Sequence, residues 1–357
     1  MTEGEERIWY TFSLAEEYGN SLRDKYGRFP RYASARSDVM EPGVSAWLLR
    51  NGLCPKYPGD RKFALCLSHD VDFLFMNKSA YLKAVMTGKA LLRGQLSSAI
   101  SGMSQDRMLD PRYSLENTLR IEKRFEATSS FYFLALGEEE KDYNYRVTDI
   151  KDQFASVLES GCEIGLHGGH GAAEREEILL AHKKRLEQAA GKPVTGYRSH
   201  YLRMDVPQTW NLLMKNGFSH DTTLGYSDST GFRNGMCHPF YPYDRGKKQF
   251  LDIVELPLAI MDVTLFNHMN LDSSQAKQLC TRLLARVAEL NGVLCFLWHN
   301  NNMQGAMGDF YSWFLQEAFD RGGWLTHSKM VEDWYRDNGY LDQTKKILQK
   351  AADADQE

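Results

Sequence analysis

Residues 63–72 read FALCLSHDVD, an apolar run of strand length that ends in polar and charged residues. Seven further runs of strand length follow, and helix-like stretches of ten or more residues separate most of them. The eight runs cover residues 63–70, 129–136, 162–168, 194–202, 218–223, 252–260, 293–300 and 324–328. Strands that alternate with helices of this length pair in parallel through right-handed crossovers.

The alternation predicts an α/β fold, and more specifically a deformed (β/α) barrel of seven or eight strands. The competing architecture is an open, doubly wound sheet. In that architecture a glycine-rich nucleotide-binding fingerprint commonly follows the first strand, and this chain has none there. We therefore expect the barrel.

Three segments flank or interrupt the alternation of strands and helices. Residues 1–60 are turn-rich and partly helical, and their aromatic content predicts an N-terminal extension packed on a barrel of residues 61–335. Residues 74–112 predict a helical insertion after the first strand, and residues 336–357 a polar C-terminal tail. The long stretch 224–247 is rich in Gly, Pro and aromatic residues, which is typical of a functional loop.

Composition excludes several classes of protein. The net charge is −4, from 43 basic and 47 acidic residues in 357, so no bulk field favours nucleic acid or an anionic membrane. The six cysteines form no CxxC pair, which favours a reducing compartment over a disulfide framework. The acidic start MTEGEERIWYTF lacks the apolar core of a secretory signal, and no apolar stretch is long enough to span a bilayer. We expect a cytoplasmic protein with no integral membrane segment and no nucleic-acid partner.

Polar residues that can bind metals lie at the C-terminal ends of several predicted strands. The relevant strand ends are SHDVD (68–72), HGGH (167–170), YRSHY (197–201) and WHNNN (298–302). Because the C-terminal rim of a barrel carries catalysis, these four segments predict one active site at that rim.

Asp70 and Asp72 are two residues apart, so on a strand their carboxylates point to the same side. One carboxylate can bind a divalent metal while the other accepts a proton from water. The alternative is a solvated turn, where aspartate is common. The apolar run that precedes the pair argues against a surface turn.

Three other strand ends carry candidate ligands and proton donors. His167 and His170 offer imidazole ligands suited to zinc and similar metals, and the glycines between them allow a sharp turn. Arg198 can hold a carboxylate in a bidentate contact, and His299 is suited to general acid catalysis. Ordinary core hydrogen bonds or surface ion pairs are the alternatives for each. Weaker candidates are His69, His200, His238 and His268, whereas His182 and His220 are expected to be surface or structural residues.

Together these motifs resemble those of the polysaccharide deacetylase family (carbohydrate esterase family four) over roughly residues 62–330. SHDVD matches the family's first motif, which carries two aspartates, and EIGLH (163–167) matches the second. YRSHY is similar to the third motif, and FLWH (296–299) looks like the last. The family's second metal-binding histidine would fall at Gly171, so either the neighbouring His170 is a shifted ligand or the metal site is incomplete.

The resemblance implies specific roles for these residues. Asp70 would be the catalytic base and His299 the general acid, while Arg198 would orient Asp70. Asp72, His167 and His170 would bind a divalent metal, expected to be zinc. The implied reaction is metal-dependent hydrolysis of an amide-type C–N bond, the deacetylation of an N-acetylated sugar or glycan precursor. Loop aromatics would either stack on the sugar or simply pack together: Tyr226, Phe232, Phe240 and Tyr241.

Two other functions remain open. A cyclic amide or imide hydrolase would keep the fold but need a closed pocket rather than an open cleft. A non-catalytic carbohydrate-binding protein on a degenerate barrel would be consistent with Gly171, and it would hold no stoichiometric metal.

Overall fold

The computed structural model describes residues 3–77, 89, 107–110, 113 and 115–354. At its centre lies β1 (Phe63–Val71), all nine residues of which are buried. One edge of β1 pairs with β12 (Val293–Leu297). The other edge is shared, because β13 (Gly323–Thr326) pairs with the first half of β1 and β4 (Ser130–Leu134) with the second half. A strand buried on both faces is apolar along its length, which is why FALCL is a continuous apolar run.

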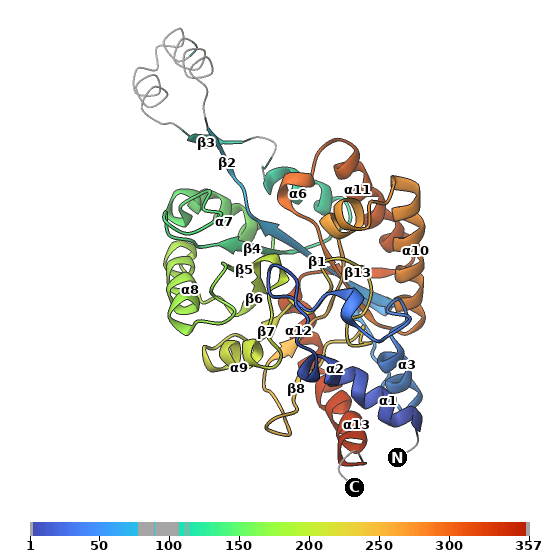
Figure 1. Cartoon of the computed structure of the whole chain (residues 1–357). Coiled ribbons are helices and arrows are strands. Elements are labelled where there is room, and N and C mark those ends of the chain that lie inside the picture. Colours follow the sequence, from blue (N-terminus) through green and yellow to red (C-terminus); the bar gives the residue numbers. More distant parts are fainter. Residues whose placement is uncertain (1–2, 78–88, 90–106, 111–112, 114, 355–357) are drawn as a thin grey trace.

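The remaining strands extend this sheet on both sides in parallel pairs. The sheet has nine strands, in the order β10-β7-β6-β5-β4-β1-β12-β11, with β13 on β1. The other strands of the sheet are β5 (Glu163–Gly168), β6 (Gly196–Ser199), β7 (His220–Asp221), β10 (Val254–Glu255) and β11 (Leu258–Met261). Figure 1 shows the helices arranged around the outside of the curled sheet.

The two outer strands of the sheet, β10 and β11, are successive pieces of one chain segment, separated only by Leu256 and Pro257. The first piece pairs with β7 and the second with β12, so this segment joins the two edges of the sheet. The amides of Leu256 and Leu258 donate to the carbonyls of Asp221 and Leu224, both at 2.9 Å. The predicted strand 252–260 is therefore divided in two, and the predicted deformed (β/α) barrel is confirmed.

Helices connect the strands much as the sequence predicts. Those of the barrel are α6 (Leu115–Lys123), α7 (Lys151–Glu159), α8 (Glu176–Ala190), α9 (Gln208–Lys215), α10 (Ser273–Glu289) and α11 (Gly305–Asp320). A capping box between Asp272 and Gln275 begins α10. Gly191 ends α8 in the left-handed conformation, with φ 71°.

Both terminal segments pack on this body. The N-terminal helices are α1 (Glu3–Phe12), α2 (Ala15–Gly19) and α3 (Gly43–Arg50), and the C-terminal ones are α12 (Ser328–Asp337) and α13 (Tyr340–Ala354). Trp9 and Phe12 of α1 are buried. The expected polar tail contains α13, which lies beside α1 and buries Leu348 and Ala352 (Figure 1). The boundaries of the expected domains remain predictions.

Two short antiparallel ribbons lie outside the main sheet. One joins β2 (Phe75–Asn77) to β3 (Arg107–Leu109), and the other joins β8 (Tyr243–Asp244) to β9 (Gln249–Phe250). The first ribbon lies at the two ends of the predicted insertion 74–112. Most of the helix predicted within the insertion falls outside the described residues. Within the described part of the chain, no helix has the length and apolar character needed to cross a membrane.

Candidate active site

A cleft of about 970 Å³ is lined by two of the predicted catalytic residues, Asp70 and His299. Its lining includes side chains from the ends of several strands, namely Asp70, Asp72, His167, His200, Asp262 and His299. Residues between Arg23 and Tyr32 of the N-terminal extension also line it, and Figure 1 shows this blue loop in front of the centre of the sheet. The four predicted strand ends therefore meet in one place.

Asp70 and Asp72 both approach the imidazole of His167. The Nε2 atom of His167 lies 3.5 Å from Asp70 Oδ2 and 3.4 Å from Asp72 Oδ1. The Oδ1 atoms of both aspartates are buried and have no hydrogen-bond partner among the described residues. Burial raises the pKa of Asp72, but contact with His167 and the charges of His200 and His299 outweigh it, so the net pKa is lowered. The carboxylate of Asp72 is therefore ionised at neutral pH and can bind a cation.

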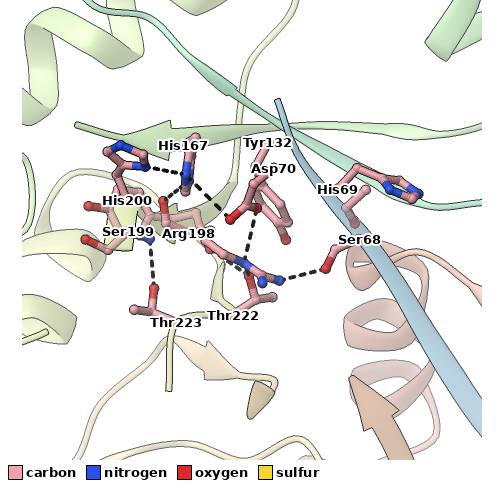
Figure 2. Close-up of polar contacts among 12 residues, drawn as sticks. Ser68, His69, Asp70, Tyr132, His167, Arg198, Ser199, His200, Thr222 and Thr223 are labelled. Atoms are coloured by element: carbon pink, nitrogen blue, oxygen red, sulfur yellow. Dashed lines mark hydrogen bonds and ion pairs between the residues drawn. The ribbon is translucent and has the colours of Figure 1, made fainter. Parts of the chain in front are cut away.

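Two histidine rings direct their second nitrogens at one another beside Asp72. His167 donates from Nδ1 to the carbonyl oxygen of Arg198, at 3.1 Å, and His200 donates from Nε2 to Asp142, at 3.3 Å. The remaining atoms, His167 Nε2 and His200 Nδ1, face each other at 3.0 Å (Figure 2). Burial lowers the pKa of His200 to about 4, so its ring is neutral at neutral pH and its Nδ1 presents a lone pair. Two imidazole nitrogens that face one another beside a carboxylate are a ligand set that fits a bound cation.

The structure places His200, and not the expected His170, beside Asp72 and His167. Asp72, His167 and His200 offer ligand atoms that all lie within 4.8 Å of one another. His170 does not belong to this group, because it lies two residues beyond the end of β5 and contacts Asp142 Oδ2 at 3.0 Å instead. His200 takes the expected place of His170, since it begins the turn directly after β6.

Arg198 lies near Asp70 without the expected bidentate contact. Its Nε is 3.8 Å from Asp70 Oδ1, which is an ion pair rather than a hydrogen bond. Nε donates to the hydroxyl of Thr222 at 3.0 Å, and Nη2 donates to that of Ser68 at 2.8 Å (Figure 2). The buried guanidinium thus supplies positive charge beside Asp70 but is oriented by Ser68 of β1 and by Thr222, which directly follows β7.

His299 is paired with an aspartate that the sequence analysis did not identify. Its Nδ1 donates to Asp262 Oδ1 at 2.7 Å, and its Nε2 lies 3.8 Å from Asp72 Oδ2. Burial lowers the pKa of His299, but the charges of Asp262, Asp72 and Asp70 outweigh burial and raise the pKa to about 10. His299 is therefore protonated and can donate a proton. Asp262 directly follows β11, and its position at a strand end was the available signal.

The weaker histidine candidates lie in different parts of the structure. His69 points away from the cleft (Figure 2) and contacts Glu122 Oε1 at 2.9 Å. His238 is buried against Ser45 and the carbonyl of Leu290. His268 does line the cleft. The residues that were set aside, His182 and His220, are both buried and structural.

The aromatic side chains of the cleft also differ from those expected. Tyr226, Phe232 and Phe240 are buried in the protein interior, and Tyr241 does not line the cleft. The long loop is held inside by backbone contacts, such as the amide of Phe232 with the carbonyl of Val39 at 2.7 Å. The aromatic residues that do line the cleft are Tyr26, Tyr32, Phe73, Tyr201 and Phe266.

Comparison with known proteins gives a likeness in structure alone. The sequence matches no protein-family model and no curated protein. The fold matches a crystal structure of a candidate polysaccharide deacetylase from Mycobacterium smegmatis, with 18% identity and a TM-score of 0.56, over 80% of this chain and 94% of that one.

Two further structures align less closely. A family 4 carbohydrate esterase from Streptomyces lividans has 9% identity and a TM-score of 0.38, over 74% of this chain and 91% of that one. A peptidoglycan deacetylase from Bacillus subtilis has 12% identity and a TM-score of 0.38, over 81% and 96%. TM-scores this low do not support a comparison of sites. On the evidence of the Mycobacterium smegmatis structure, this chain has the polysaccharide deacetylase fold, which confirms the predicted resemblance at the level of the fold.

Proposed function

We propose that this protein is a metal-dependent deacetylase that hydrolyses the amide of an N-acetylated sugar or glycan precursor. The observation that carries the proposal is the arrangement in one cleft of two aspartates whose buried Oδ1 atoms have no hydrogen-bond partner among the described residues, two imidazoles whose nitrogens face one another at 3.0 Å, and a protonated histidine. The similarity in fold to a candidate polysaccharide deacetylase supports the choice of substrate class.

Asp72, His167 and His200 would hold the metal. Three such ligands with a free coordination position are typical of catalytic zinc, so we propose zinc as the ion. When bound, the ion would supply Lewis-acid polarisation of the acetyl carbonyl and lower the pKa of a water molecule. The two ligand histidines are held by hydrogen bonds on their far nitrogens, as in other metal sites.

The other groups of the cleft would move protons. Asp70 accepts a proton from the attacking water, and the positive charge of Arg198 beside it stabilises the anion. His299 donates its proton to the nitrogen of the amide as the C–N bond breaks, so the products are acetate and the free amine. Asp262 holds His299 in place and in its charged form.

The size of the cleft favours a glycan over a small cyclic amide. About 970 Å³ is at the upper end of the range for small-molecule sites, and it accommodates more than one sugar ring. The case for a non-catalytic binder rested on Gly171, but His200 supplies a third ligand without that position. The cytoplasmic location remains a proposal, for which the six unpaired cysteines, all in the described part of the chain, are the support.

The test is release of acetate from N-acetylglucosamine and from short chitin oligosaccharides by the zinc-loaded protein. We expect activity that chelation abolishes and zinc restores, and a loss of at least about 100-fold in kcat for Asp70→Asn, because the base is removed while the metal ligands remain. Asp320→Asn, which removes a carboxylate from the far end of α11, should keep full activity. Absence of acetate release from every one of these substrates by the zinc-loaded wild type would overturn the proposal.

A further inference from the structure

Asp142, in the loop that follows β4, lies between three side chains at the wall of the cleft. One of its oxygens, Oδ2, is 3.0 Å from His170 Nε2, 3.3 Å from His200 Nε2 and 3.0 Å from the hydroxyl of Tyr201. A carboxylate can only accept hydrogen bonds, so all three neighbours donate to it. Asp142 was not among the residues predicted from the sequence.

The contact with Asp142 decides which nitrogen of His200 carries the proton. A neutral imidazole has one N–H, and in His200 that N–H is at Nε2, where the carboxylate accepts it. The other nitrogen, Nδ1, then has a free lone pair, and it lies 3.7 Å from Asp72 Oδ1. Without an acceptor at Nε2, His200 could instead place its proton on Nδ1 and block its own lone pair.

We propose that Asp142 is a positioning residue that fixes the ring orientation and the tautomer of His200, and so makes Nδ1 of His200 a metal ligand. The proposal rests on the proposed function, since it assigns a role toward the same metal. His170, expected as a ligand, and Tyr201 hold the carboxylate of Asp142 in place. Carboxylates that accept from ligand histidines in this way tune metal affinity in many metal sites.

The backbone supports this assignment. Asp142 and Tyr201 both have left-handed conformations, with φ of 69° and 60°. Such conformations are unfavourable for residues other than glycine, above all for bulky ones such as tyrosine. The chain therefore adopts an unfavourable conformation at Tyr201, a position whose side chain donates to Oδ2 of Asp142.

A rival interpretation is that Asp142 itself binds a cation. Asp142, His170 and His200 also form a group whose ligand atoms lie within 4.8 Å of one another. A second ion there would require His200 to lose the proton at Nε2 and bridge two metals. The two interpretations differ in the number of ions bound per chain, so a titration separates them.

The experiment is a calorimetric titration of zinc ions into the metal-free full chain, for wild type, Asp142→Asn and Glu139→Gln. Asparagine can turn its amide N–H₂ group toward Nε2, which favours the wrong tautomer of His200. We expect one zinc ion per wild-type chain and an affinity about 10- to 100-fold weaker in Asp142→Asn. Glu139→Gln removes an exposed charge three residues away and should match wild type. The visible spectrum of the cobalt-substituted protein should change in Asp142→Asn and not in Glu139→Gln.

The possible outcomes have distinct meanings. Equal zinc affinity in wild type and folded Asp142→Asn would overturn the role of Asp142 alone. Two ions in wild type and one in Asp142→Asn would also overturn it, in favour of a second cation site. If Asp142→Asn does not fold, Tyr201→Phe removes one donor to the carboxylate and should weaken zinc binding, and unchanged affinity there would overturn the proposal. A wild type that binds no zinc would overturn the proposed function as well.

Discussion

At the scale of single residues, Asp262 and His299 form the pair on which proton donation depends. Four donors converge on the buried carboxylate of Asp262, namely Nδ1 and the backbone amide of His299, the side-chain amide of Asn302 and the backbone amide of Val263. Burial alone would lower the pKa of His299, and the nearby carboxylates raise it to about 10. The proton that His299 donates is therefore available at neutral pH because Asp262 stays ionised.

The substitution Asp262→Asn is expected to lower the pKa of His299 toward its ordinary value, because the neighbouring negative charge is lost. A raised pKa keeps a histidine protonated at higher pH, so the alkaline limb of the pH profile of kcat/KM should move to lower pH. At pH 8 the loss should be roughly 10²- to 10⁴-fold, the usual contribution of a general acid. Asp320→Asn, at the exposed end of α11, serves as the control. An alkaline limb that stays in place would contradict this role of the pair.

At the scale of elements, the N-terminal extension forms part of the wall of the cleft. Tyr26 stacks on Tyr201, with ring centroids 4.7 Å apart and planes at 10°. Nη1 of Arg28 donates to the carbonyl of Tyr201 at 2.9 Å, and the amide of Arg31 donates to Asp228 at 3.0 Å. Because Tyr201 follows His200 directly, the extension is anchored beside the proposed metal ligands.

The substitution Tyr26→Ala tests whether this wall contributes to substrate binding. Removal of the ring takes away an aromatic surface of the cleft and the support of Tyr201, so KM for a chitin oligosaccharide should rise several-fold while kcat changes less. Tyr10→Ala, which removes a half-exposed ring of α1 outside the cleft, is the matched control and should leave both parameters unchanged. Equal KM values for Tyr26→Ala and wild type would argue against a role of the extension in binding.

At the scale of the whole molecule, a buried cluster of charged side chains links two strands of the barrel to helix α12. His220 of β7 contacts Glu163 of β5 at 3.2 Å and Glu332 of α12 at 2.9 Å. Burial lowers the pKa of His220, but the two glutamates outweigh burial and raise it to about 10. Burial likewise raises the pKa of Glu332, but His220 outweighs it, so that the pKa falls to about 2.

These shifts predict how stability depends on pH. The contribution of His220 is complete below its ordinary pKa of 6.5 and is lost as the pH rises through about 10. The contribution of Glu332 is complete above 4.5 and is lost as the pH falls through about 2. The free energy of unfolding in urea should therefore decline between pH 6.5 and pH 10.

The substitution His220→Gln isolates this effect. It removes the cation shared by two buried carboxylates, so it should destabilise the protein by about 3–5 kcal/mol at pH 6.5 and reduce the decline toward pH 10. His268→Gln, at an exposed position of the cleft, should behave as wild type. Parallel curves for wild type and His220→Gln would exclude the cluster as the source of the pH dependence.

The sequence by itself determined the elements and the end of the barrel at which the site lies. The apolar runs at 63–70 and 293–300 are unmistakable because central parallel strands are buried on both faces. Polar residues such as Asp70 and His299 are conspicuous where these runs end. The position of a residue along a strand and its place at the rim follow from local order in the chain, which a sequence displays directly.

Only the tertiary structure decided which side chains meet at the rim. His200 rather than His170 joins Asp72, and Asp142 and Asp262 enter the site from other loops. The reason is that the imidazole rings of His170, His200 and His299 are oriented by hydrogen bonds to residues 28 to 58 positions away in the chain. The same is true of Arg198, which is oriented by its hydrogen bonds to Ser68 and Thr222, distant from it in the sequence. The segment 252–260 divides because its halves pair with β7 and β12, at opposite ends of the sheet order. Such contacts depend on how distant strands align in space, and no local pattern encodes them.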